Sequence, residues 1–120
     1  RPEERLAAVG QAICMAIKTY RPDLLAIETL FFSVNKKSAL QVAEARGAIL
    51  AVAGAEHIQV HEFSPATVKL AVTGHGAADK AAIARMIPHL IALPPKNRLD
   101  DELDAIAVAI AGLAAGKASA

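Results

Sequence analysis

Three acidic residues, Glu28, Asp101 and Asp104, have types and spacings that could support chemistry. Glu28 directly follows the apolar run 24–27, at the carboxyl end of a sequence typical of a buried strand. Ligands and chemistry usually lie at that end of an open α/β sheet. Asp101 and Asp104 are three residues apart, and on a helix this spacing places both carboxylates on one face. Three carboxylates that face one cleft repel one another and require a divalent cation.

Oxygen-rich clusters of this kind select Mg²⁺ or Mn²⁺. Two such ions can activate water and stabilise the leaving oxygen in phosphodiester hydrolysis. A simpler interpretation is that Glu28 marks the exit of the strand to solvent and that the aspartates stabilise a helix N-terminus. It does not explain Asp104, which lies in the inner turn, next to the apolar positions Ile106 and Ala107.

The composition bounds the class of protein. The 120 residues suffice for a single domain, and 54% of them are hydrophobic, so the chain can bury an aliphatic core. Its single cysteine, Cys14, excludes an internal disulfide and a cysteine-rich zinc site. No secretory leader is visible and no apolar stretch is long enough to span a membrane, so we expect a cytoplasmic protein without a membrane partner.

Charge is distributed unevenly along the chain. The net charge is only +1, but residues 36–98 contain eight Lys and Arg residues against four Asp and Glu residues. The acidic run 100–104 follows directly. A basic surface beside a compact acidic cluster suits an enzyme that binds a polyanion around a cation site. From the charge counts alone, ordinary solvated faces are the favoured explanation.

The elements that must position these residues follow from apolar periodicity and from turn signals. The pattern predicts strands at 24–28 and 58–63, and helices at 3–20, 37–53, 65–73, from Asp79 onward, and 101–115, with a frayed tail from Gly116. The order strand, helix, strand, helix favours an α/β fold with parallel pairing.

Two further features leave alternatives open. Phe31 and Phe32 lie side by side in the loop 29–35, where they either pack into the core or form a stacking platform for an unpaired base. The helix 37–53 has an apolar surface broader than packing on one sheet face needs, so it is either sandwiched or part of an oligomer interface. Gly47 at its middle costs about 1 kcal/mol relative to alanine, which suggests close approach of another backbone.

Several motifs in matching order together resemble the RuvC family of Holliday-junction resolvases: Ala26-Ile27-Glu28 with Phe31, Glu44-Ala45-Arg46-Gly47, Val68-Lys69, Gly74-His75-Gly76 followed by Lys80, and the run from Asp101 to Ala107. The resemblance covers nearly the whole chain. It implies an RNase H-like fold, a homodimer, and symmetric cleavage of four-way DNA junctions with Mg²⁺ or Mn²⁺. It also implies a branch-migration complex as partner and a bacterial cytoplasmic location.

The resemblance assigns roles residue by residue. Glu28, Asp101 and Asp104 match three of the family's four catalytic carboxylates, which bind the metal. Lys69 and Lys80 match basic residues beside the active site, suited to phosphate contact and transition-state charge. Phe31 matches an aromatic residue that stacks on a base near the junction centre.

Two further sets of residues complete the predicted site. Because the middle of the chain is basic, it also contributes to the predicted DNA-binding set, which is Phe31, Lys36, Lys37, Lys69 and Lys80. The helix 37–53 matches the dimer-forming element, so the predicted dimer interface is Leu40, Ala43, Gly47 and Leu50.

One departure from the family pattern bears on activity. The family's first catalytic aspartate lies in an Asp-Pro-Gly motif on an N-terminal strand, and no such motif occurs in the 120 residues. Asp23 is no substitute, because it precedes a different strand. We therefore expect a single RuvC-like domain, 1–120, that is N-terminally incomplete and lacks three strands and this aspartate. Its two remaining strands should leave an apolar edge and face exposed.

The leading hypothesis is a metal-dependent, structure-specific endonuclease that resolves four-way junctions in recombination and repair by phosphodiester hydrolysis. The isolated chain is then weakly active or inactive. One alternative is a non-catalytic junction-binding or dimerisation module, since the first aspartate is absent. Another is an RNase H-like nuclease that acts on different nucleic acids, although Phe31 and the dimer helix argue against it through the resemblance.

Overall fold

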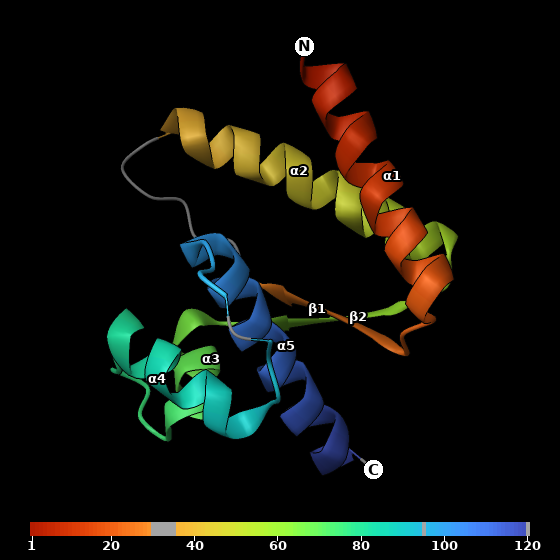
Figure 1. Ribbon diagram of the computed structural model, residues 1–120. Coiled ribbons are helices and arrows are strands. Elements are labelled where there is room, and N and C mark those ends of the chain that lie inside the picture. The colour runs from red at the N-terminus through yellow and green to blue at the C-terminus, as the bar shows by residue number, and fades with distance from the viewer. Residues whose placement is uncertain (30–35, 95, 120) are drawn as a thin grey trace. The chain divides into compact units, whose positions relative to one another are not determined.

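The computed structural model describes residues 1–29, 36–94 and 96–119, with the side chains of residues 36, 37 and 117–119 excepted. The chain divides into two compact units (Figure 1). Unit 1 comprises Arg1–Leu25 and Leu30–Val60, and unit 2 comprises Ala26–Thr29 and His61–Ala120. The assignment of one domain to 1–120 stays a prediction.

All seven predicted elements are present: α1 (Pro2–Tyr20), β1 (Leu24–Glu28), α2 (Lys36–Ala55), β2 (Gln59–Phe63), α3 (Pro65–Thr73), α4 (Lys80–Leu90) and α5 (Asp100–Ser119). The prediction of a frayed tail from Gly116 was wrong, because α5 continues to Ser119. Alanine is frequent along α5 as a whole, and its high helix propensity offsets the cost of Gly116.

The two strands pair with each other in parallel, as predicted (Figure 1). At their carboxyl ends the Thr29 amide donates a hydrogen bond to the Phe63 carbonyl at 2.8 Å. Parallel neighbours need a crossover connection, and α2 lies in that connection along the chain. The pairing therefore places the end of β1, where Glu28 lies, beside the end of β2 and the start of α3.

In unit 1, α1 and α2 pack against each other. Gly10 of α1 faces α2, since a Cβ there would lie 3.5 Å from Cγ2 of Val52. Cys14 is half-buried, and its thiol lies 3.5 Å from a Glu56 carboxylate oxygen. Cys14 is thus a free thiol of the α1–α2 packing, in agreement with its apolar spacing.

In unit 2, helices α3, α4 and α5 share one core with the end of β2. Ile87 of α4 is its most deeply buried large side chain, with an exposed fraction of 0%. Capping fixes where α3 and α4 begin. The Ser64 hydroxyl accepts from the Thr67 amide at 3.1 Å, and Asp79 accepts from the Ala82 amide at 2.8 Å. These caps set the positions of Lys69 and Lys80 on their helices.

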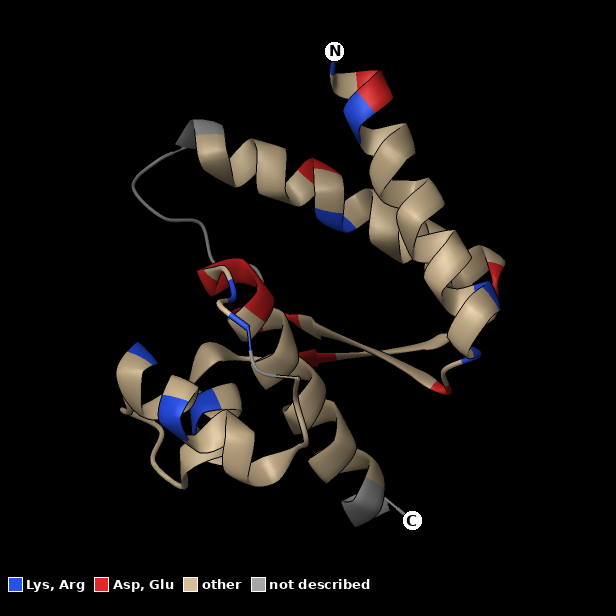
Figure 2. Ribbon diagram, viewed as in Figure 1, with Lys and Arg blue, Asp and Glu red and all other residues tan. Residues whose placement is uncertain are grey.

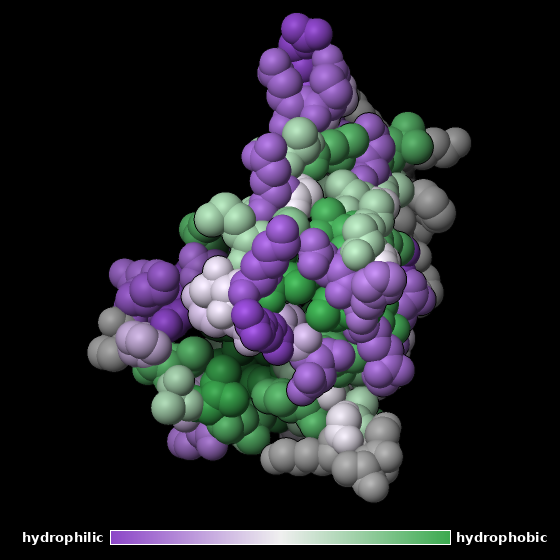
Figure 3. Space-filling model, turned by 90° about the vertical axis from the view of Figure 1, so that its right-hand side faces the viewer, coloured by the Kyte–Doolittle hydropathy of each residue, from purple (hydrophilic) through white to green (hydrophobic). Residues whose placement is uncertain are grey.

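Unit 2 also leaves apolar surface uncovered. Figure 3 shows apolar surface at the level of α4 and of the second half of α5. The large exposed apolar side chains of this unit are Leu70, Leu90, Leu99 and Leu113. No helix in the described part of the chain is both long enough and apolar enough to cross a membrane.

Candidate active site

The first turn of α5 carries the densest negative charge in unit 2 (Figure 2). Asp100, Asp101 and Glu102 form this turn, and all three are exposed. The Leu103 amide donates to the Leu99 carbonyl at 3.2 Å, which closes the turn. Leu103 itself is half-buried and packs against the core, so the helix presents its acidic residues away from that core.

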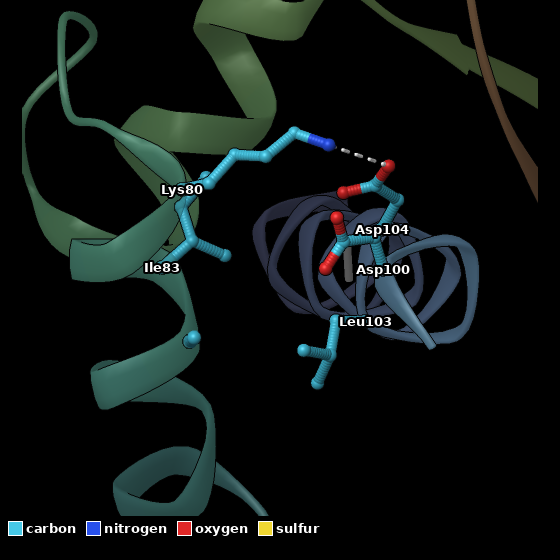
Figure 4. Close-up of a pocket in the computed structure, with 6 residues that line it drawn as sticks. Lys80, Ile83, Asp100, Leu103 and Asp104 are labelled. Atoms are coloured by element: carbon cyan, nitrogen blue, oxygen red, sulfur yellow. Dashed lines mark hydrogen bonds and ion pairs between the residues drawn. The ribbon is translucent and has the colours of Figure 1, made fainter. Parts of the chain in front are cut away.

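Asp104 meets a cation from the neighbouring helix. The Lys80 ammonium, on the first residue of α4, lies 3.5 Å from a carboxylate oxygen of Asp104. The lysine side chain is 71% exposed and the aspartate side chain 49%. Figure 4 shows Lys80 reaching from α4 toward Asp104, with Asp100 beside it. Together with Ile83 and Leu103 they line a cavity of about 50 Å³.

Asp100 is a residue of this cavity that the sequence did not single out. The predicted helix begins at residue 101, whereas the structure makes Asp100 the first residue of α5. Its position in the acidic run 100–104 was the only available signal. Asp100 and Asp104 are four residues apart, so they share a helix face, and that face is turned to Lys80.

The remaining predicted catalytic residues also lie in unit 2. Glu28 is the last residue of β1 and is exposed. Lys69 is half-buried in α3, and its carbonyl accepts a hydrogen bond from the Thr73 hydroxyl at 2.8 Å. Asp101 is exposed on α5, next to the residues that line the cavity. Among these five predicted residues, all of them described, only Lys80 and Asp104 form an ion pair with each other.

The predicted metal ligands supply suitable donors but not a complete site. Carboxylate oxygens are the donors that Mg²⁺ and Mn²⁺ prefer, and Glu28, Asp101 and Asp104 are all exposed. Among the described residues, however, no group of three His, Cys, Asp or Glu side chains is close enough to hold one ion. The expected convergence of these three residues is therefore not seen in the described part of the chain.

Several predicted contact residues fall outside what the structure describes. Phe31 lies outside the described residues, and so do the side chains of Lys36 and Lys37 at the start of α2. The predicted dimer residues are all on α2 in unit 1. Leu40 is 63% exposed, Gly47 is exposed, and Ala43 and Leu50 are half-buried.

Comparison with known proteins identifies the family. The family model of the crossover junction endodeoxyribonuclease RuvC matches residues 1–112. The chain is 41% identical over 106 residues to the crossover junction endodeoxyribonuclease RuvC of Caldicellulosiruptor saccharolyticus. The chain belongs to the RuvC family. The match covers 88% of this chain but 64% of that relative, so the chain spans less than two thirds of the relative's length.

Solved RuvC structures have the same fold. The RuvC structure from Thermus thermophilus matches 99% of this chain and 72% of its own, with a TM-score of 0.89 at 28% identity. T. thermophilus RuvC in complex with a Holliday junction substrate matches 92% of this chain and 67% of its own, with a TM-score of 0.86 at 30% identity. The RuvC resemblance and the RNase H-like α/β fold that the sequence predicted are thereby confirmed.

The exposure of the Lys80–Asp104 pair predicts that it contributes little to stability. In a double-mutant cycle of Lys80→Ala and Asp104→Ala, we expect a coupling free energy below about 1 kcal/mol, because water screens exposed ion pairs. Urea unfolding of the four variants measures it. The Lys96–Glu102 pair, at 3.7 Å and similarly exposed, is the matched control. A coupling of about 3 kcal/mol, typical of a buried pair, contradicts this description of the site.

Proposed function

We propose that this chain carries the acidic site of a metal-dependent endonuclease that resolves four-way DNA junctions by phosphodiester hydrolysis. The observation that carries the proposal is the meeting of Lys80 with Asp104, beside Asp100, in a chain of the RuvC family. T. thermophilus RuvC has been solved in complex with a Holliday junction substrate, which supports junction DNA as the ligand. We also propose that the protein acts in recombination and repair in the bacterial cytoplasm. Its proposed partner there is a branch-migration complex.

Each residue has a proposed role. Glu28, Asp101 and Asp104 are the proposed ligands of Mg²⁺ or Mn²⁺. Lys69 and Lys80 are proposed to contact the phosphate at the cleavage site, where a fixed cation offsets the negative charge that develops in the transition state. Phe31, Lys36 and Lys37 are proposed DNA contacts, Phe31 by stacking on an unpaired base.

A second candidate function is a non-catalytic module that binds junctions or mediates dimerisation. One observation favours it. The described residues contain no group of three His, Cys, Asp or Glu side chains that could hold a metal ion. Under this proposal the basic residues still bind DNA phosphates, but the acidic turn of α5 has no role in cleavage.

Cleavage of a synthetic four-way junction in the presence of Mg²⁺ separates the two proposals. We expect the 120-residue chain to cut weakly or not at all, and a version extended by an N-terminal strand with an Asp-Pro-Gly motif to cut the junction. In the extended version, Asp104→Asn should lower the rate about 100-fold or more, because a metal-site carboxylate is lost. The measurement is the single-turnover rate on junction and on linear duplex DNA.

Glu102→Gln provides the matched control for this experiment. Glu102 lies in the same acidic turn but pairs with Lys96 at 3.7 Å, so its loss should leave the rate nearly unchanged. If the extended version binds the junction without cutting it, the second candidate is correct. If Asp104→Asn cuts as fast as the unmutated version, Asp104 has no catalytic role.

We also propose that α2 forms a homodimer interface through Leu40, Ala43, Gly47 and Leu50. The large exposed fraction of Leu40 supports this, since 63% of an apolar side chain is left in water. Apart from α2's own backbone and the two neighbouring residues, no described atom would lie within 4 Å of a Cβ at Gly47. The described residues of unit 1 therefore do not make the close approach that the mid-helix glycine suggested, and a second chain is its proposed partner.

Gly47→Leu tests this interface. Because the space around Gly47 is open, we expect the variant to fold and, through better helix propensity, to be up to about 1 kcal/mol more stable as a monomer. It should nevertheless weaken self-association at least tenfold, since a bulky side chain holds the two helices apart. Analytical ultracentrifugation measures the dissociation constant, with Gly116→Leu on α5 as control. Unchanged self-association would exclude Gly47 from the interface.

A further inference from the structure

A second cavity in unit 2 lies along a different part of α4. It has a volume of about 530 Å³ and is lined by the end of α3, by the turn that follows, and by Ala82 and Arg85 of α4. A water molecule occupies about 30 Å³, so this cavity has room for a phosphate group together with its hydration. Lys80 and Asp104 do not line it, so it is separate from the cavity of the candidate active site.

The wall formed by the turn is held in place by its own hydrogen bonds. The Thr73 hydroxyl lies 2.8 Å from the Lys69 carbonyl and 3.0 Å from the His75 carbonyl, and accepts from the His75 amide at 3.1 Å. Gly74, with φ of 81°, supplies the left-handed conformation that this turn needs. The polar groups of Thr73 therefore fix the shape of the wall.

Arg85 is the permanently charged side chain of this cavity. It is exposed, and it forms no side-chain ion pair or hydrogen bond with another described residue. The other arginine of unit 2, Arg98, differs in this respect, because its Nη2 donates to the Pro94 carbonyl at 2.9 Å. Asp79 also lines the cavity, but one of its oxygens accepts from the Ala82 amide at 2.8 Å and caps α4.

We propose that this cavity binds a backbone phosphate of the DNA, with the Arg85 guanidinium as donor. This rests on the proposed function in that DNA is the ligand. A guanidinium presents paired N–H donors that match phosphate oxygens, and it stays charged at any physiological pH. No Phe, Tyr or Trp lines the cavity, and the imidazole of His75, which does line it, can donate a hydrogen bond to a phosphate oxygen.

The place of Arg85 on α4 defines what this contact does. Arg85 is five residues after Lys80, which corresponds to about 7.5 Å along the helix axis and about 140° around it. The two cations therefore project from different sides of α4, in agreement with the separate cavities that they line. Phosphate contacts position a duplex without reading its sequence. Arg85 is thus a positioning contact, on a different side of α4 from the cleavage phosphate that Lys80 is proposed to meet.

The first test uses inorganic phosphate and NMR. In a ¹⁵N-labelled sample of the 120-residue chain, we expect phosphate to shift the amide signals of Gly76, Ala77 and Ala78, relative to chloride at the same ionic strength. Arg85→Gln should abolish these shifts, and Arg98→Gln, the same change on an arginine that is already engaged, should preserve them. If phosphate causes no shift in this turn, or if Arg85→Gln leaves the shift unchanged, the phosphate site is excluded.

The second test measures junction affinity against salt concentration. Arg85→Gln should reduce the slope of log K against log salt by about 0.9, the value for one phosphate contact, and Arg98→Gln should not change it. An unchanged slope in Arg85→Gln overturns the inference. If the unmutated chain binds no junction, the proposed function fails, and the phosphate titration still decides whether the cavity is an anion site.

Discussion

The packing of α5 against α3 and α4 is the constraint on which the candidate site depends. Ala107 and Ala111 of α5 are each only 2% exposed, and they face the same core as Ile87 of α4. Side chains as small as alanine let helices approach closely, so the rotation of α5 about its axis is fixed. That rotation turns Asp100 and Asp104 toward Lys80. The polar site is thus positioned by apolar contacts one and two turns further along the helix.

The ion pair between Lys80 and Asp104 is weak compared with this apolar packing. Lys80 and Asp104 lie 3.5 Å apart with both side chains largely in water, where such a pair contributes little to folding. Both groups therefore remain available to a ligand at small cost. A polyanion offers Lys80 a stronger partner, and a divalent cation does the same for Asp104. The arrangement suits the proposed function, in which the Lys80–Asp104 ion pair is replaced by contacts of Lys80 with DNA and of Asp104 with a metal ion.

Local signals in the sequence located most of the elements. Ser64-Pro65 and Asp79 predicted the starts of α3 and α4, since caps act within one turn of the chain. The apolar run ending at Glu28 gave β1 with its bounds. The end of α5 was misjudged, because a tail of small residues carries no strong stop signal.

The candidate site was less predictable, since its members are distant along the chain. Lys80 and Asp104 are 24 residues apart, and no periodicity links positions on two different helices. The resemblance to the RuvC family supplied that pairing, and comparison with known proteins confirmed the family. Asp100 escaped notice because, in sequence, it is one of several neighbouring acids. Gly47 could be identified as unusual, but only the structure shows that the described residues leave the space beside it open.

The central proposal is that a divalent cation draws together the carboxylates of Glu28, Asp101 and Asp104, which do not form a set of three ligands in the described structure. Paramagnetic broadening by Mn²⁺, followed in ¹⁵N spectra of the 120-residue chain, tests it most directly. The account predicts the strongest broadening at the amides of Asp101 and Asp104, with broadening at Glu28, and its loss in Asp104→Asn but not in Glu102→Gln. Broadening that spares Glu28, or that persists unchanged in Asp104→Asn, would contradict it.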